Sequence, residues 1–291
     1  MSLKIIKAGE TGFCFGVKRA INILEKAAKE YGSLETLGPV VHNDQVTEKL
    51  KSQGIQSIRG LEEIRSATVA ISSHGVTPEI EAALRAKKVR VIDTTCPFVK
   101  RAQMAAKELV ESGFYVIVYG ESQHPEVKGI LGWAKGQGRA VLDAGSLKEG
   151  DNLTRKMGVL SQTTQVTEKY LQFTKDLIDM GFREDAEIRI IDTICHDIRK
   201  RQAITFQLAG EVDLMLIVGG RTSANTRHLQ EICSRVVESH LIEKADDIEL
   251  DWLSGKSRLG IASGTSTAEE TINEVIQHIT EEDRRHNRQG S

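Results

Sequence analysis

The chain has 291 residues, a formal net charge of −2 and an aromatic content of only 4%. The near balance of 39 basic and 41 acidic residues argues against a broad polyanion-binding surface, and the scarcity of aromatic side chains argues against a platform for base stacking. The N-terminal residues lack the apolar core of a signal peptide, and no apolar run has the length of a membrane span, so we expect a cytoplasmic protein.

Short apolar runs alternate along the chain with longer amphipathic segments. The runs expected to form strands are, in chain order, 67–71, 90–92, 115–119, 157–160, 188–191, 214–218 and 259–261. Apolar residues at helical spacing predict helices at 17–29, 98–112 and 167–180. This alternation predicts an α/β fold with mostly parallel sheets, in which functional sites lie at the carboxyl ends of the strands.

Three of the four cysteines share a local context. Cys14, Cys96 and Cys195 each precede an expected helix that opens with a Lys-Arg pair. A long repeat of this kind predicts three pseudo-equivalent α/β domains, where length alone predicts about two. The expected domains are 14–95, 96–193 and 194–280 together with 1–13, followed by a flexible tail at 281–291. Cys233 lacks this context, and we interpret it as a core residue.

Polar loops form a second recurring feature, with two loops to each repeat. They contain histidines, hydroxyls and amides, which together with backbone N–H groups at helix starts suit a small anion such as phosphate. The loops are marked by His42 and His74, by His124 and Thr163, and by Ser223 and Ser266. Glu126, two residues after His124, is a candidate proton donor, although a carboxylate there can also cap a helix.

The chemistry of the three cysteines has more than one interpretation. Three thiolates suit zinc with a fourth ligand such as histidine, or an iron–sulfur cluster in which one iron lacks a protein ligand. A zinc- or thiol-based structural or redox protein is therefore an alternative, as is simple packing of the thiols. The Lys-Arg pairs raise the possibility of nucleic-acid binding. Because the net charge is near zero, we interpret them as solvated helix faces and expect no nucleic-acid partner.

The motifs occur in a fixed order between about residues 5 and 280. They are Gly-Phe-Cys14, Val-Val-His42-Asn, Ser-x-His74-Gly-Val, Thr-Cys96-Pro, His124-Pro-Glu126-Val, Gln-Thr163-Thr164 and Ile-Cys195. Together they resemble the 4-hydroxy-3-methylbut-2-enyl diphosphate reductases, the terminal enzymes of the methylerythritol phosphate route to isoprenoids. Ala224 and Thr267-Ala268 depart from residues frequent in that family.

The resemblance implies a trefoil of three α/β domains around one 4Fe–4S cluster per chain. Cys14, Cys96 and Cys195 match the ligands of that cluster, in which one iron stays open to substrate. Electrons would come from a ferredoxin- or flavodoxin-type donor, and the products would be isopentenyl and dimethylallyl diphosphate. Glu126 and Thr163 match the catalytic residues. The residues that match the substrate-binding set are His42, His74, His124, Thr163, Thr164, Ser223, Asn225 and Ser266.

Overall fold

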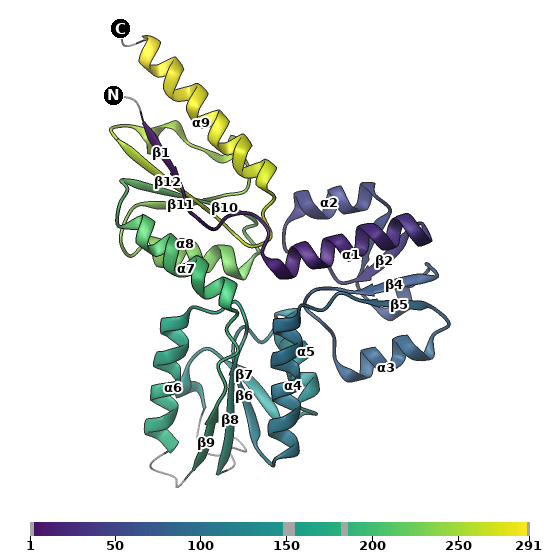
Figure 1. Ribbon diagram of the computed structural model, residues 1–291. Helices are drawn as coiled ribbons and strands as arrows, with labels where there is room; N and C mark the ends of the chain where they lie inside the picture. Colours follow the sequence, from purple (N-terminus) through teal and green to yellow (C-terminus); the bar gives the residue numbers. More distant parts are fainter. Residues whose placement is uncertain (1–2, 148–154, 182–185, 290–291) are drawn as a thin grey trace. The chain divides into compact units, whose positions relative to one another are not determined.

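The structure is a computed structural model that describes residues 3–147, 155–181 and 186–289. Its strands form three four-stranded sheets in which every pairing is parallel, with helices packed against them (Figure 1). The expected α/β fold is therefore confirmed. The chain divides into two compact units. The first comprises the described residues of 1–18, 41–49 and 196–291, and the second those of 19–40 and 50–195.

The first unit contains one sheet. Its strands, in spatial order, are β1 (Lys4–Lys7), β12 (Arg258–Ser263), β10 (Leu214–Val218) and β11 (Ser239–Ile242). Helices α7 (His196–Ala209), α8 (Ala224–Cys233) and α9 (Glu269–Gln289) belong to this unit, as do residues 44–49 of α2 (Asp44–Ser52). All residues of the two central strands except Arg258 are buried because helices cover the sheet on both sides: α7 and α8 on one side and α9 on the other (Figure 1).

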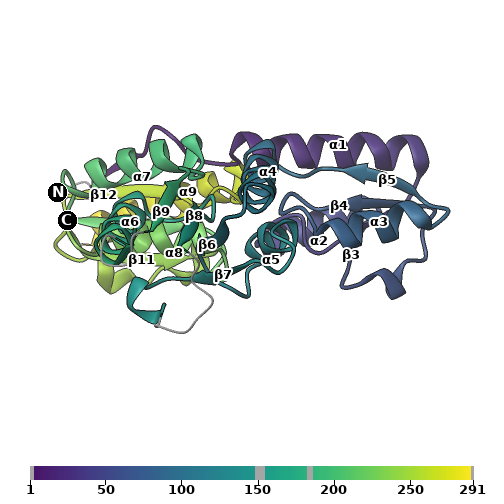
Figure 2. The same ribbon diagram turned by 90° about the horizontal axis from the view of Figure 1, so that it is seen from below.

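The second unit contains two sheets. The first has strands in the order β3 (Ile55–Ile58), β2 (Leu34–Leu37), β4 (Thr68–Ile71) and β5 (Arg90–Asp93). Its neighbouring helices along the chain are α1 (Phe15–Tyr31), α2 (Asp44–Ser52) and α3 (Pro78–Ala86). Helices α1 and α3 lie on opposite sides of this sheet (Figure 2). The α3 helix shows how local sequence starts a helix, because the Thr77 hydroxyl accepts from the N–H of Ile80 and proline occupies the first turn.

The other sheet of the second unit follows directly along the chain. Its strands are β7 (Gly138–Val141), β6 (Tyr115–Tyr119), β8 (Lys156–Ser161) and β9 (Glu187–Ile190). Its helices are α4 (Pro97–Glu111), α5 (Pro125–Trp133) and α6 (Thr167–Gly181). A core of buried apolar residues from α4, α5, β6, β8 and the turn before β6, including Leu109, Phe114, Ile130 and Leu160, holds this layer together.

The three sheets share one connectivity. In each, a central strand leads through a helix to one edge, the chain returns to the other central strand, and a further helix follows; in the second unit this helix leads on to the opposite edge strand. In the first unit the opposite edge strand is β1, from the start of the chain, which pairs with β12. The expected domain boundaries, including the assignment of residues 1–13 to the third domain, stay a prediction. Short 3₁₀ segments lie at Leu61–Glu63, Ala144–Ser146, Ala245–Asp247 and Leu250–Leu253.

The differences from the sequence-based prediction lie mostly at sheet edges. All of the expected strands form, but β1, β2, β3, β7 and β11 were not expected. Of these, β2 is a central and fully buried strand, but it has only four residues and includes the polar Glu35 and Thr36. The other four, β1, β3, β7 and β11, are edge strands in which at most two residues are buried, so they lack the continuous apolar run that marks a central strand. Helix α9 also continues to Gln289, into the expected tail, where pairs such as Arg285 with Glu282 add local support.

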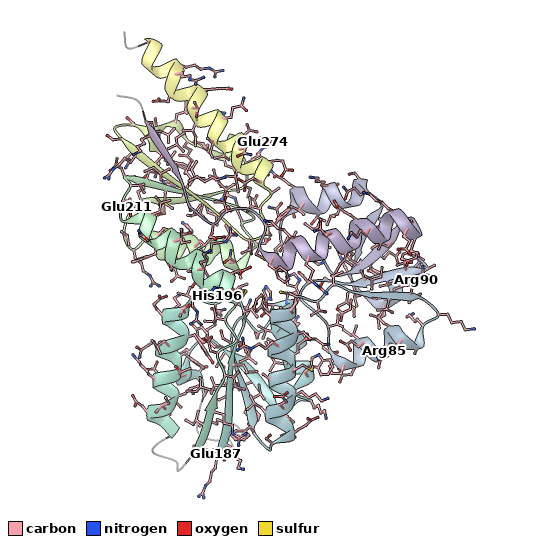
Figure 3. All side chains as sticks on the ribbon, viewed as in Figure 1. Arg85, Arg90, Glu187, His196, Glu211 and Glu274 are labelled. Atoms are coloured by element: carbon pink, nitrogen blue, oxygen red, sulfur yellow. The ribbon has the colours of Figure 1, made fainter. Side chains whose placement is uncertain are left out.

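Charged side chains gather on the outside of the elements. Figure 3 labels several of them, and Arg85, Arg90, Glu187, Glu211 and Glu274 are all exposed. Within the part of the chain that the structure describes, no helix combines the length and the apolar character that crossing a bilayer requires.

Candidate functional site

The residues expected at the site all follow the carboxyl ends of strands. Each sheet contributes two polar loops after its central strands and one cysteine after an edge strand. After β2, β4 and β5 come His42, His74 and Cys96; after β6, β8 and β9 come His124, Thr163 and Cys195; after β10, β12 and β1 come Ser223, Ser266 and Cys14. Since parallel strands end at the same edge of a sheet, one repeated design places all nine.

Each cysteine forms an equivalent backbone hydrogen bond to the neighbouring polar loop of its sheet. The N–H of Cys96 donates to Ser73 O at 3.0 Å, next to His74 in the chain. The N–H of Cys195 donates to Thr163 O at 3.0 Å, and the N–H of Cys14 donates to Thr265 O at 3.2 Å. These bonds couple each thiol to a predicted substrate-binding loop of the same sheet.

Glu126 is a buried carboxyl in the first turn of α5. It is 2% exposed, and its two oxygens accept from Thr163: the backbone N–H at 2.6 Å and the hydroxyl at 3.0 Å. Burial raises the pKa of Glu126 to about 7, although both bonds from Thr163 act to lower it. The carboxyl does not cap α5, because the N-cap position belongs to His124. A group with these properties exchanges a proton near neutral pH.

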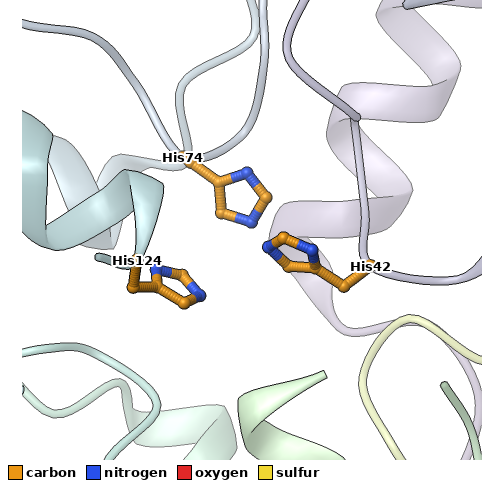
Figure 4. A group of neighbouring side chains, drawn as sticks. All are labelled: His42, His74 and His124. Atoms are coloured by element: carbon orange, nitrogen blue, oxygen red, sulfur yellow. The ribbon is translucent and has the colours of Figure 1, made fainter. Parts of the chain in front are cut away.

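His124 is oriented by the helix that it caps. Its Nδ1 accepts from the N–H of Glu126 at 3.2 Å, so the proton of the neutral ring resides on Nε2. The same loop therefore presents an imidazole N–H donor and, two residues on, a buried carboxyl. In Figure 4 the ring of His124 lies beside that of His74, with centroids 5.5 Å apart and planes at 84°.

The loop that carries His74 needs glycine at the next position. Gly75 has a φ of +69°, in the left-handed region, and a Cβ built there would come within 2.4 Å of Gln103 Nε2. Gln103 belongs to α4, whose N-cap is Cys96. The backbone of the histidine loop thus lies against the helix that begins at a candidate ligand.

The first unit presents buried polar atoms at the edge of its own sheet. Asn225, in the first turn of α8, is 2% exposed, and Ser266, after β12, is 5% exposed. Among the residues that the structure describes, neither the side-chain amide of Asn225 nor the hydroxyl of Ser266 has a hydrogen-bond partner. Buried polar atoms of this kind cost free energy unless something satisfies them, so they mark a place for a polar ligand.

The other expected binding residues have local roles as well. Ser223 caps α8 by accepting from the N–H of Thr226 at 3.4 Å. Thr164 accepts from Gln162 Nε2 at 3.2 Å. His42, the third histidine labelled in Figure 4, belongs to the first unit. Its carbonyl oxygen lies so close to Gly220 that a Cβ built on that glycine would be only 2.4 Å away. Glycine at that position therefore allows the His42 loop to lie against the loop after β10.

The donor set of the three cysteines fits a thiolate-bound metal group. Each thiol lies at the start of a helix, and backbone N–H groups of Gly16 and Val17 face the sulfur of Cys14. Burial nevertheless raises the pKa of the Cys14 thiol, so that a bound metal, which requires thiolate, would supply the missing stabilisation. Soft thiolates select zinc or iron–sulfur clusters. Cys233, wholly buried in α8 with a pKa raised by burial to about 12, has no place in this set.

Sequence reasoning missed two features of the cysteine loops. One is an Asp-Thr-x-Cys pattern, in which Asp93 Oδ1 accepts from the N–H of Thr95 and Asp192 Oδ1 accepts from the N–H of Ile194. The other lies in the Lys-Arg pairs, whose interpretation as solvated faces is wrong for Arg201, which is only 3% exposed. His196, labelled in Figure 3, begins α7 directly after Cys195 and is exposed.

The chain matches the family model described as LytB protein over residues 5–280. A 4-hydroxy-3-methylbut-2-enyl diphosphate reductase of Dehalococcoides mccartyi (strain CBDB1) is 54% identical over 277 residues, which cover 95% of this chain and 98% of the relative. The reductase of the same name from Geobacter metallireducens is 41% identical over 285 residues, covering 97% and 98%.

Solved structures of the same kind of enzyme are similar to this fold. One, of (E)-4-hydroxy-3-methyl-but-2-enyl diphosphate reductase, described as the terminal enzyme of the non-mevalonate pathway, has a TM-score of 0.71 and 38% identity and covers 96% of this chain and 99% of that one. Another, the E-1-hydroxy-2-methyl-but-2-enyl-4-diphosphate reductase of Plasmodium falciparum, has a TM-score of 0.88 and 25% identity and covers 95% of this chain and 88% of that one.

Proposed function

Because the chain belongs to the LytB protein family, we propose that it reduces 4-hydroxy-3-methylbut-2-enyl diphosphate to isopentenyl and dimethylallyl diphosphate. The reaction consumes two electrons and two protons. The allylic C–O bond breaks, the oxygen leaves as water, and a C–H bond forms at one of two carbons of the allyl fragment. The zinc- or thiol-based alternative has no support from the relatives.

The observation that carries the proposal is the buried pair of Glu126 and Thr163. A carboxyl with a pKa of about 7 is protonated in a large fraction of molecules at neutral pH and can release that proton when negative charge or a leaving hydroxide develops nearby. The Thr163 hydroxyl, 3.0 Å from one carboxyl oxygen, can take that proton while donating its own. Glu126 would thus deliver protons through a neighbour that is held in place.

Enzymes of this family carry an iron–sulfur cluster. For this chain we infer one 4Fe–4S cluster held by Cys14, Cys96 and Cys195, with one iron open to substrate. When bound, such a cluster supplies electrons one at a time and a Lewis-acidic iron. The helix starts and the bonded loops support the assignment, because they hold each thiol beside a predicted substrate-binding loop of its own sheet.

The diphosphate would be bound by polar groups of the loops and helix starts that follow the strands. Asn225 and Ser266 offer buried groups whose hydrogen-bonding capacity is unused among the described residues, and His124 offers its Nε2–H. His42, His74, Thr164 and Ser223 complete the proposed set. Burial strengthens such bonds to an anion, so the diphosphate would supply binding energy that orients the reacting end of the substrate.

A reduction assay tests the proposed function. The full chain, reconstituted with iron and sulfide without oxygen, is mixed with the diphosphate substrate and a dithionite-reduced viologen dye. We expect dye oxidation with formation of both products, two dye molecules per molecule of substrate. Reduced ferredoxin and reduced flavodoxin are then compared as donors, and we expect at least one of them to replace the dye. Failure of the loaded protein to form either product would overturn the proposal.

A further inference from the structure

Arg19, in the second turn of α1, reaches a loop far from its own position in the chain. Its Nη1 donates to Thr94 O at 3.4 Å and to Thr95 O at 3.2 Å. These carbonyls belong to the two residues directly before Cys96, and all four residues lie in the second unit. The helix that follows Cys14 therefore holds the loop that carries Cys96.

Arg101, at the same place in α4, makes the corresponding contact one repeat further on. Its Nη2 donates to Asp192 O at 2.7 Å. Asp192 opens the short loop to Cys195, and its carboxylate oxygen also accepts from the N–H of Ile194. The helix that follows Cys96 therefore holds the loop that carries Cys195, again within the second unit.

Arg201, in α7, closes the series within the first unit. Its Nη2 donates to Gly12 O at 2.9 Å, two residues before Cys14, and its Nη1 donates to Ser263 O at 2.9 Å. The hydroxyl of Ser263 in turn accepts from the N–H of Gly12 at 2.9 Å. The helix that follows Cys195 therefore holds the loop that carries Cys14.

We propose that Arg19, Arg101 and Arg201 are positioning residues that fix the three cysteine-bearing loops in cyclic order, each arginine acting on the loop of the next cysteine. The inference rests on the proposed function in taking these three cysteines as the cluster ligands. None of the arginines is placed at the substrate. Their effect is on where the thiols lie before and after the cluster binds.

The chemistry of the guanidinium group explains why each position holds arginine. A guanidinium is permanently charged and presents several N–H donors in one rigid plane, so it can hold two carbonyls at a fixed separation, as Arg19 and Arg201 do. A lysine ammonium at the end of a flexible chain lacks that geometry. Burying Arg201 to 3% exposure carries a desolvation cost, which its three carbonyl and hydroxyl acceptors offset.

Cysteine alkylation in the full chain before cluster loading tests the cyclic order directly. Arg19→Met and Arg101→Met are compared with Lys18→Met and Lys107→Met, which remove a cation from the same helices. Iodoacetamide incorporation at each thiol is followed by peptide mass spectrometry. We expect Arg19→Met to speed labelling of Cys96 about tenfold and Arg101→Met to speed labelling of Cys195 about tenfold, since each loses a charge-assisted hydrogen bond.

The controls should label at the wild-type rate, and each arginine variant should leave the thiol at the start of its own helix unchanged. For the buried Arg201 the variant is Arg201→Lys, which keeps the positive charge near the thiol while changing the hydrogen-bond geometry, and the expected increase is at Cys14. Unchanged labelling rates would overturn the proposal. An equal increase at all three thiols would also overturn it, because it would show that the whole fold, and not one cysteine loop, has become less stable.

A second measurement, the rate of iron release, tests whether the three arginines also stabilise the bound cluster. In reconstituted protein, the arginine variants should release iron to a chelator about tenfold faster than wild type, and Arg19→Lys should recover part of the difference. Wild-type protein that takes up no iron would overturn the proposed function. If wild-type protein takes up iron, but the arginine variants are labelled and release iron at the wild-type rates, the positioning role of the three arginines is overturned and the proposed function stands.

Discussion

The two oxygens of the Glu126 carboxyl accept two hydrogen bonds from one residue, Thr163: its backbone N–H at 2.6 Å and its hydroxyl at 3.0 Å. The carbonyl of Thr163 in turn accepts from the N–H of Cys195 at 3.0 Å. A candidate proton donor and a candidate cluster ligand are thus bonded to opposite ends of the same peptide segment. Movement of one strand end would disturb both functions.

The first prediction concerns the pH dependence of turnover. Glu126 donates a proton only while protonated, so turnover should fall as pH rises through about 7. Glu126→Gln keeps the volume and both bonding partners but removes the acidic proton. We expect about a 100-fold or greater loss of turnover in this variant, with iron content and substrate affinity unchanged. A variant that turns over at the wild-type rate would remove Glu126 from its proposed role.

Thr163 allows a sharper test of the same pair. Its hydroxyl bond lowers the pKa of Glu126, so Thr163→Val, which deletes the hydroxyl at nearly constant volume, should raise that pKa further. The alkaline fall in turnover should then move to higher pH, while maximal turnover drops because the relay hydroxyl is gone. Thr163→Ser, which keeps the hydroxyl, should behave like wild type. An unmoved pH profile in Thr163→Val speaks against the bond.

Asn225 carries a prediction about substrate affinity. Because its buried amide makes no hydrogen bond within the described part of the chain, Asn225→Ala should leave the melting temperature nearly unchanged. Binding of isopentenyl diphosphate, measured by calorimetry, should weaken about 10-fold to 100-fold, the value of a hydrogen bond to a charged group. Ser234→Ala, at the other end of α8, is the matched control and should bind as wild type. Equal affinity in Asn225→Ala would exclude a diphosphate contact there.

Variants of the fourth cysteine, Cys233, distinguish thiols that bind the cluster from a thiol that only packs in the core. Cys233 is wholly buried, and its sulfur lies 3.9 Å from Thr205 O in the adjoining helix. Cys233→Ala should keep the full iron and sulfide content after reconstitution, whereas Cys14→Ala, Cys96→Ala and Cys195→Ala should each lose most of it. Iron content that depends on Cys233 would show that the proposed ligand set is incomplete or incorrect.

The parts of the fold predicted from sequence are those with a strong local signal. Leu214–Val218 can be identified as a strand from its five consecutive apolar residues. These residues are apolar because the strand is buried between helices. Ile55–Ile58 is not identified, because only its first and last residues are buried and four residues are too few for a pattern. The pairing of β1 with β12 is a contact between residues far apart in the sequence, and no local motif marks it.

In the candidate site too, the features with a local sequence signal were predicted and those that depend on tertiary structure were not. Cysteines at helix starts and polar residues after strands are visible in sequence, since their types and positions are unusual. The clamping arginines were not recognised, because a Lys-Arg pair on a solvated helix and one that reaches a distant carbonyl look alike. Lys18 is exposed while Arg201 is buried, and only tertiary structure separates the two cases. The raised pKa of Glu126 likewise arises from burial that no local motif encodes.

The central claim is that this chain is an iron–sulfur reductase whose cluster is held by Cys14, Cys96 and Cys195. The most direct test is the content of iron and acid-labile sulfide per chain in protein purified and reconstituted without oxygen. We predict a brown protein with about four iron and about four sulfide per chain. A colourless protein that binds one zinc per chain and no sulfide would contradict the claim.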